Sequence, residues 1–193
     1  MRRVCVFCGS SPGARPAYRE AAALLAEAMV ERGIELVYGG ARVGLMGEIA
    51  DAVRGRGGRV TGVIPHSMVR REIAHHDIDD LRVVGTMHER KALMTELSDG
   101  FVALPGAYGT LDELAEALTW SQLGIHGHPI GLLDVEGYYA HLLAFFDHAV
   151  EEGFLRPAYR ELLLTDRRPR ALLERMAAHR PARRDRWLDR ARP

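Results

Sequence analysis

Phe101-Val-Ala-Leu-Pro-Gly-Ala-Tyr-Gly-Thr-Leu-Asp-Glu113 joins an apolar run to a stretch with helical periodicity through a short loop that contains proline and glycine. The run 101–104 is typical of a buried strand, and we expect an amphipathic helix to begin after Thr110. Gly106 and Gly109 let the backbone approach a ligand closely. A strand, a glycine loop and a helix in this order indicate one unit of an open parallel sheet.

The same alternation runs along the whole chain. Short runs rich in Val, Ile and Leu predict seven strands, the last of them the weakest, at residues 4–8, 35–38, 59–64, 81–84, 101–104, 130–133 and 162–164. Helical patterns lie between them, near residues 16–32, 43–56, 87–98, 111–123, 137–152 and 168–179. Buried strands separated by helices predict an α/β fold, a doubly wound parallel sheet with helices on both faces.

A single domain is expected, because no linker, repeat or low-complexity segment interrupts this series. We place the domain at residues 1–180. Residues 181–193 are polar and Arg-rich, which is more typical of a flexible, solvated tail than of a nucleic-acid-binding arm.

The composition excludes several classes of protein. The 193 residues carry 26 basic and 26 acidic side chains, so the chain has no basic excess of the kind that a sequence-independent nucleic-acid binder shows. No apolar run reaches the roughly 18 residues that cross a bilayer, and the residues before the first glycine turn are too few for a signal peptide. Two cysteines give no disulfide framework. We therefore expect a cytoplasmic protein with no nucleic acid and no membrane among its partners.

Three glycine-bearing turns follow predicted strands, at residues 8–11, 38–41 and 104–107. Ligands of open parallel sheets bind beyond the carboxyl ends of the strands, so we expect these turns to share one edge of the sheet. Amide groups at the helix start after the third turn suit an anion, and the Thr110 hydroxyl adds a donor. The loop lacks both the P-loop and the dinucleotide patterns. A phosphate-bearing ligand is therefore predicted, and a triphosphate or NAD is not.

Each charged residue near these turns can be interpreted either as structural or as part of a functional site. Thr110 and Glu113 have the spacing of a capping box, yet a carboxylate at this edge also suits catalysis. Arg90 and Lys91 are neighbours on a predicted helix and diverge by about 100°, so that one of them can face a site. With Glu89 they also suit a solvated charged face.

Other reactive side chains give weaker signals. Lys91 is the only lysine, so any Schiff-base chemistry, pyridoxal phosphate included, depends on it. Cys5 and Cys8 fall at i and i+3 of a predicted strand and point to opposite faces, which favours two buried thiols over a redox pair. His75 and His76 are adjacent and point apart, and no second cluster has ligand spacing. No metal site is therefore expected.

Three motifs together resemble the LONELY GUY (LOG) family, the cytokinin-activating phosphoribohydrolases that were long labelled lysine decarboxylases. They are residues 38–47 (Tyr-Gly-Gly-Ala-Arg-Val-Gly-Leu-Met-Gly), 87–91 (Met-His-Glu-Arg-Lys) and 105–113 (Pro-Gly-Ala-Tyr-Gly-Thr-Leu-Asp-Glu). The similarity extends from Cys8 to Phe154, about three-quarters of the chain.

The resemblance implies a Rossmann-like fold and a homodimer or larger assembly, and we expect helix 87–98 near the interface. It implies that water cleaves the N-glycosidic bond of an N6-substituted adenosine 5′-monophosphate, or of AMP, to free base and ribose 5-phosphate. It implies neither a metal nor another cofactor, and it places the catalytic pair on Arg90 and Glu113. The substrate-binding positions that it implies are Glu72, Arg90, Lys91, Gly106, Ala107, Tyr108, Gly109, Thr110, Leu111, Asp112, Glu113 and Thr119.

In this interpretation Glu113 stabilises positive charge on the sugar or activates the water. Arg90 holds Glu113 ionised, or contacts the phosphate or the sugar hydroxyls, and the sequence does not choose among these. Ala107 departs from the family, which has glycine there. If its φ were positive, alanine would cost about 1 kcal/mol and weaken binding.

Two rival functions follow from the same residues. One is a lysine decarboxylase that holds pyridoxal phosphate on Lys91. The other is a non-catalytic nucleotide-binding or carrier protein of the same fold, in which Ala107 marks the lost activity.

Overall fold

The computed structural model describes residues 1–69 and 73–180. A seven-stranded sheet lies at its centre in the order β4-β3-β2-β1-β5-β6-β7, and every neighbouring pair runs parallel. The strands are β1 (Arg3–Phe7), β2 (Glu35–Tyr38), β3 (Val60–Pro65), β4 (Asp80–Val84), β5 (Gly100–Ala103), β6 (Ile130–Leu133) and β7 (Leu163–Asp166). All seven predicted strands are therefore present.

The helices lie between the strands in the chain. They are α1 (Pro16–Val30), α2 (Gly44–Arg54), α3 (His66–Val69), α4 (Met87–Glu96), α5 (Tyr108–Gln122), the 3₁₀ helix η1 (Val135–Gly137), α6 (Ala140–Glu151), α7 (Pro157–Arg160) and α8 (Pro169–Ala178). Helix α3, η1 and α7 were not predicted, because three or four residues are too few to show helical periodicity.

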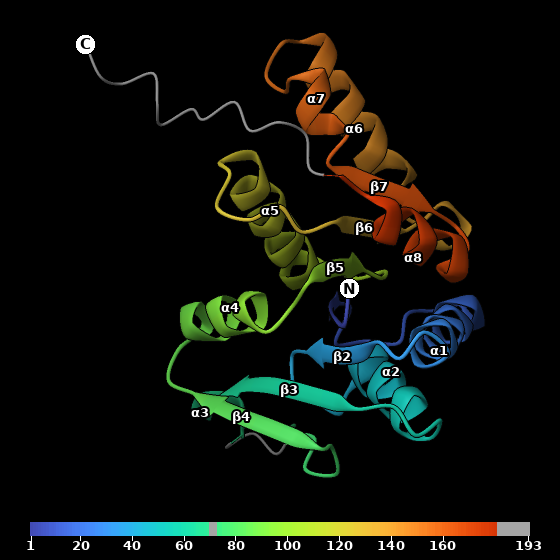
Figure 1. Cartoon of the computed structure of the whole chain (residues 1–193), viewed down its shortest axis with the longest axis vertical. Coiled ribbons are helices and arrows are strands. Elements are labelled where there is room, and N and C mark those ends of the chain that lie inside the picture. Colours follow the sequence, from blue (N-terminus) through green and yellow to red (C-terminus); the bar gives the residue numbers. More distant parts are fainter. Residues whose placement is uncertain (70–72, 181–193) are drawn as a thin grey trace.

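Helices cover both faces of the sheet and enclose two apolar clusters (Figure 1). Helices α1, α2 and α8 pack on one face, where Leu25 and Leu36 are fully buried. Helices α4 and α5 pack on the other face around Phe101 and Leu114, and α6 lies against this second cluster with half-buried side chains. The doubly wound Rossmann-like α/β fold is thus confirmed. Residues 181–193, the predicted tail, lie outside the described residues, so the domain boundary stays a prediction.

The strand order reverses between β1 and β5. The chain builds β2, β3 and β4 to one side of β1, then returns to place β5 on the other side of β1 and continues outward through β6 and β7. The loops after β1 and β5 therefore diverge at the carboxyl edge of the sheet, which is where open parallel sheets form their ligand sites.

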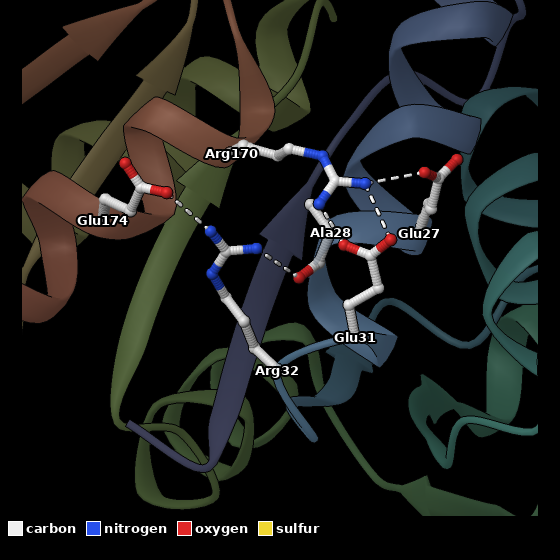
Figure 2. Close-up of polar contacts among 6 residues, drawn as sticks. All are labelled: Glu27, Ala28, Glu31, Arg32, Arg170 and Glu174. Carbon is white, nitrogen blue, oxygen red and sulfur yellow. Dashed lines mark hydrogen bonds and ion pairs between the residues drawn. The ribbon is translucent and has the colours of Figure 1, made fainter.

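Ion pairs between α1 and α8 fasten the last described helix to the first (Figure 2). Arg170 Nη2 donates to Glu27 Oε1 at 2.8 Å and to Glu31 Oε1 at 2.7 Å, and Arg32 Nη2 lies 2.9 Å from Glu174 Oε1. The hydrogen bond from Arg170 lowers the pKa of Glu31 below its ordinary value. A lowered folded-state pKa stabilises the protein above the ordinary carboxyl pKa, and this contribution is lost as the pH falls through the lowered value.

We expect Arg170→Gln to lower the melting temperature slightly at neutral pH, because both of its glutamate partners lose their cation. The loss should vanish in about 1 M salt, where the Debye length is about 3 Å and exposed pairs are screened. Thermal unfolding at two salt concentrations measures it. Arg168→Gln is the control, since Arg168 is 83% exposed and lies 3.9 Å from Asp166. Equal shifts in both variants, or a shift that persists in salt, would contradict the proposed network.

Candidate active site

A cavity of about 460 Å³ opens at the carboxyl edge of the sheet between β1 and β5. Its wall includes residues from all three predicted glycine turns, among them Gly9, Gly39 and Gly106. The turns therefore gather at one edge, as the parallel sheet predicts. Arg90 and Glu113 also line this cavity.

Arg90 reaches the cavity from the first turn of α4. Thr86 caps this helix, since its hydroxyl accepts from the Glu89 amide at 3.1 Å and the Glu89 carboxylate accepts from the Gly85 amide at 2.9 Å. The Arg90 side chain is 9% exposed, and its Nε donates to the Val63 carbonyl at 3.2 Å. The solvated-face interpretation therefore holds for the exposed Glu89 and is wrong for Arg90.

Glu113 lies on α5 opposite Arg90, with 3.3 Å between its Oε1 and the arginine Nη2. The helix begins at Tyr108, earlier than predicted, and its N-cap is Ala107, which makes no side-chain capping bond. Thr110 is therefore inside the first turn and cannot be the N-cap residue of a capping box. The capping interpretation of Glu113 is wrong, and its buried carboxylate faces the guanidinium instead.

The surroundings of Glu113 favour its neutral form more than water does. Burial raises the pKa of this carboxyl above its ordinary value, and the Arg90 guanidinium opposes part of that rise. A carboxyl with a raised pKa and a fixed cationic partner can exchange a proton nearer to neutral pH than an exposed glutamate can.

The loop before α5 is held by backbone contacts. The Pro105 carbonyl accepts from the Gly9 amide at 3.0 Å, and the Tyr138 hydroxyl donates to the Gly106 carbonyl at 2.9 Å. A Cβ on Gly106 would lie 2.0 Å from Thr110 Oγ1 and 2.9 Å from the Gly9 nitrogen, so only glycine fits here. The loop is thus held in place on the cavity wall, and it leads into the N-terminus of α5, where the first amides of a helix are free to bind an anion.

Ala107 has a φ of −105°. The strain that a positive φ would cause in alanine at this position is therefore absent. Alanine keeps the amide, and its φ is one that L residues adopt, while the accompanying ψ of −142° lies outside the main helical and β regions.

We expect Ala107→Gly to leave kcat and KM for AMP within about twofold, because the observed φ is open to either residue. Glycine frees the unfolded chain but is preferred to alanine at an N-cap, so stability should change by less than about 1 kcal/mol. Steady-state kinetics and thermal unfolding measure both. A loss of tenfold or more in a folded variant would show that the loop depends on the alanine methyl group.

Lys91 points away from the cavity, toward α5. Its Nζ lies 3.1 Å from Asp112 Oδ2 and 3.1 Å from Glu116 Oε1. Burial acts to lower the pKa of this lysine, but the hydrogen bonds to Asp112 and Glu116 outweigh it and raise the pKa. A Schiff base forms from a neutral amine, so this environment opposes the chemistry of a pyridoxal enzyme.

The structure separates the predicted binding residues into two groups. Six line the cavity: Arg90, Gly106, Ala107, Gly109, Thr110 and Glu113. Five others on the same helices lie outside its lining: Lys91, Tyr108, Leu111, Asp112 and Thr119. Of these, Tyr108 is 91% exposed and Thr119 donates to the Ala115 carbonyl of its own helix. Glu72 lies outside the described residues.

Two tyrosines and three methionines of the cavity wall were missed by the sequence analysis. Tyr18 and Tyr138 meet edge to face with their ring centroids 5.6 Å apart, and Tyr138 holds the loop through Gly106. Met46, Met68 and Met87 form part of the apolar wall. Only Met46 and Met87 belonged to quoted motifs, and nothing in their spacing distinguished a wall residue from a core residue.

The remaining candidates are resolved by burial. Cys5 and Cys8 are free and buried in different clusters, on opposite faces of the sheet, as predicted. Among residues 1–69 and 73–180, no group of His, Cys, Asp and Glu side chains is arranged to hold a metal ion. In the same part of the chain no helix is long and apolar enough to cross a membrane.

The fold and the cavity define a Rossmann-like α/β protein with a buried arginine–glutamate ion pair at the point where the strand order reverses. A family model described as "Possible lysine decarboxylase" matches residues 46–176. A probable cytokinin riboside 5′-monophosphate phosphoribohydrolase of Oryza sativa subsp. japonica is 56% identical over 164 residues, which cover 85% of this chain and 72% of that relative. A cytokinin riboside 5′-monophosphate phosphoribohydrolase of Arabidopsis thaliana is 48% identical over 180 residues, covering 93% and 84%. The chain therefore belongs to the LOG family.

Solved structures share the fold at low identity. The molybdenum cofactor carrier protein of Chlamydomonas reinhardtii has a TM-score of 0.70 at 22% identity, covering 92% of this chain and 99% of that one. A molybdenum cofactor binding protein of Rippkaea orientalis has a TM-score of 0.69 at 21% identity, covering 92% and 96%. At such identity these similarities show the fold alone.

Proposed function

We propose that this chain hydrolyses the N-glycosidic bond of N6-substituted adenosine 5′-monophosphates, and of AMP itself, and releases free base and ribose 5-phosphate. The buried Arg90–Glu113 pair in the cavity carries the proposal. The names of relatives at about half identity over most of the chain support the same reaction. The mechanism needs no metal and no other cofactor.

Glu113 acts on the sugar in this mechanism. Cleavage of the ribosyl–base bond develops oxocarbenium character, which a nearby carboxylate stabilises while it orients or deprotonates the attacking water. The phosphate binds the amides of the loop 105–110, so the ribose lies over the first turns of α5, where Glu113 lines the cavity. The loop thus binds the phosphate, and Glu113 on α5 acts on the reacting sugar.

Arg90 has the role of holding Glu113. Of the roles left open by the sequence, this one fits the 3.3 Å contact and the fixed Nε–Val63 hydrogen bond. The guanidinium opposes the rise of the Glu113 pKa that burial causes, and so keeps more of the carboxyl ionised for base catalysis. The substrate contacts implied by the resemblance for Glu72, Lys91, Tyr108, Leu111, Asp112 and Thr119 stay predictions.

A panel of nucleoside 5′-monophosphates assayed for free base and ribose 5-phosphate tests the proposed function. Release of both products from AMP and from its N6-substituted derivatives is expected. Binding of these nucleotides without product release would instead identify the carrier protein named above as the rival. An absorbance band of a pyridoxal imine in the purified protein would favour the decarboxylase.

We also propose that the chain forms at least a homodimer and works in the cytoplasm. No residue of α6 is buried although the helix is strongly apolar, and Phe145 on it is 61% exposed. Met87, at the start of the helix expected near the interface, is 39% exposed. The two free thiols agree with a reducing compartment.

We expect Phe145→Glu to lower the molar mass measured by light scattering toward the 21.4 kDa of one chain, because a buried charge opposes apolar association. Leu24→Glu is the control: Leu24 is 53% exposed on α1, across the sheet, and its variant should keep the assembly. A fully active 21.4 kDa monomer of the unaltered protein would contradict the proposed assembly.

A further inference from the structure

Gly39 stands where the guanidinium of Arg90 passes the end of β2. A Cβ built on this glycine would lie 2.0 Å from Arg90 Nη2 and 3.1 Å from Arg90 Cζ, with Met46 Sδ also at 3.1 Å. Carbon and nitrogen atoms do not approach to 2.0 Å without a bond, so any side chain at position 39 requires the guanidinium to move.

The backbone at this position does not itself require glycine. Gly39 is not among the glycines with a positive φ, whereas its neighbour Gly40 has a φ of +73° and makes the turn. The three atoms nearest the added Cβ all belong to side chains. Alanine at position 39 is therefore compatible with the chain path. It is incompatible with the observed place of the guanidinium, whereas the flexible Met46 side chain needs to move by only a few tenths of an ångström.

The guanidinium has little freedom to move and keep its contacts. Arg90 Nε donates to the Val63 carbonyl of β3, and Nη2 reaches Glu113 on α5 past the end of β2. The Arg90 and Glu113 side chains are only 9% and 10% exposed, so solvent cannot replace their contact. Displacing Nη2 from the space above Gly39 therefore disturbs its 3.3 Å contact with Glu113.

We propose that Gly39 is a positioning residue, whose missing side chain lets the Arg90 guanidinium reach the carboxylate of Glu113. The catalytic consequence rests on the proposed function, because it assumes that Glu113 acts in turnover. The stabilising contact does not, since it concerns the folded protein alone. Two measurements keep these parts separate.

A double-mutant cycle in urea tests the contact. Gly39→Ala should raise the unfolding equilibrium constant about tenfold in the unaltered protein, because it separates a buried cation from a buried carboxyl. In an Arg90→Ala background the same substitution should change that constant by less than about threefold, since the methyl group enters the vacated space. The two effects are thus expected to be strongly non-additive.

Gly55→Ala is the matched control. Gly55 has a φ of −58°, and the nearest atom to its added Cβ is the Asp51 carbonyl oxygen at 3.2 Å, on the same helix and away from the cavity. Its effect should be the same with and without Arg90. Equal effects of Gly39→Ala in both backgrounds, or failure of both Gly39→Ala proteins to fold, would show that the backbone needs the glycine and would overturn the proposal. Folding of the double variant alone would support it.

The pH dependence of kcat tests the catalytic consequence. The charged and titratable groups that act on Glu113 come from three elements, namely Arg90 and Lys91 from α4, Asp112 and Glu116 from α5, and Cys5 and Cys8 from β1 and its following turn. With Arg90 displaced, burial of Glu113 is opposed less, so the acid limb of the profile should move to higher pH.

We expect Gly39→Ala to lower kcat for AMP at neutral pH by roughly tenfold or more and to shift the acid limb upward, while Gly55→Ala does neither. An unmoved limb in a folded, active Gly39→Ala protein would overturn the positioning role. Absence of turnover in the unaltered protein would contradict the proposed function. The double-mutant cycle in urea would then still test whether Gly39 permits the contact between Arg90 and Glu113.

Discussion

Adenosine is expected to be hydrolysed far more slowly than AMP, with kcat/KM lower by about 10²–10⁴. The loop 105–110 and the first turn of α5 present amide groups, and no acidic residue lies in that turn to compete with a dianion. Each hydrogen bond to a charged group contributes about 1.5–3 kcal/mol, so losing two or more of them accounts for the expected drop. Initial rates with both substrates measure the difference.

The same loop supplies the control for this result. Thr110 is buried beside Gly106, and its hydroxyl is a further donor next to the proposed phosphate. Thr110→Val should lower kcat/KM for AMP and leave kcat/KM for adenosine unchanged, so that the ratio of the two values falls. Equal kcat/KM values for the two substrates in the unaltered protein would contradict the phosphate site, whether or not Glu113 acts in catalysis.

The sheet could be predicted because its central strands are short runs rich in apolar residues. Val4, Val37 and Ile130 lie in runs of this kind, and a parallel sheet covered on both faces buries such runs completely. The order of the strands was not predictable from the pattern, since β5 pairs with β1 and not with β4, its predecessor in the chain. The gathering of the three glycine turns follows from parallel strands alone, so that part of the site could be predicted.

The start of α5 was misplaced because two signals in the sequence agreed on a start after Thr110, later than the true one. Thr110 and Glu113 have capping-box spacing, and Tyr108 and Gly109 are weak helix formers. In the fold, the helix starts at Tyr108, and Thr110 packs against Gly106. A side-chain cap does form at the start of α4, where Thr86 accepts from the Glu89 amide and Glu89 accepts from the Gly85 amide. For Glu89 the sequence analysis considered only a charged face.

The pairing of Arg90 with Glu113 could not be derived from spacing, because 23 residues and one strand separate them in the sequence. It arises because α4 and α5 cover the same face of the sheet, α4 over β3 and β4 and α5 over β1 and β5. The resemblance named both residues, and the geometry supplies what the resemblance could not, namely the Val63 carbonyl and Gly39 that fix the guanidinium. Phe145, in the predicted helix 137–152, and Phe154 just after it are exposed. Helical periodicity predicts an apolar face, but a face covered by the same chain and one covered by another copy have the same pattern.

Glu113→Gln is expected to lower kcat by roughly 10²–10⁴ while AMP still binds, because the carboxylate is lost and the phosphate loop is unchanged. Stability should fall by an amount similar to that expected for Gly39→Ala, since the neutral amide leaves the buried Arg90 guanidinium without its carboxylate partner. In the unaltered protein the base form is lost as the pH falls through the pKa of Glu113, which burial raises, so activity should decline at a higher pH than an exposed glutamate would give. Single-turnover rates, calorimetric AMP binding and a melting curve measure the three parts.

Glu116→Gln is the matched control, with the same chemical change one turn further along α5. Glu116 pairs with Lys91 and lies outside the lining of the active-site cavity, and Asp112 remains to hold that lysine when it is lost. Its variant should therefore keep kcat within about threefold, since removing one partly exposed ion pair costs little. If both variants were folded and equally active, the negative charge of Glu113 would have no part in turnover. The reaction would then need another base in the cavity, and the contact of Arg90 with Glu113 would be a purely structural ion pair.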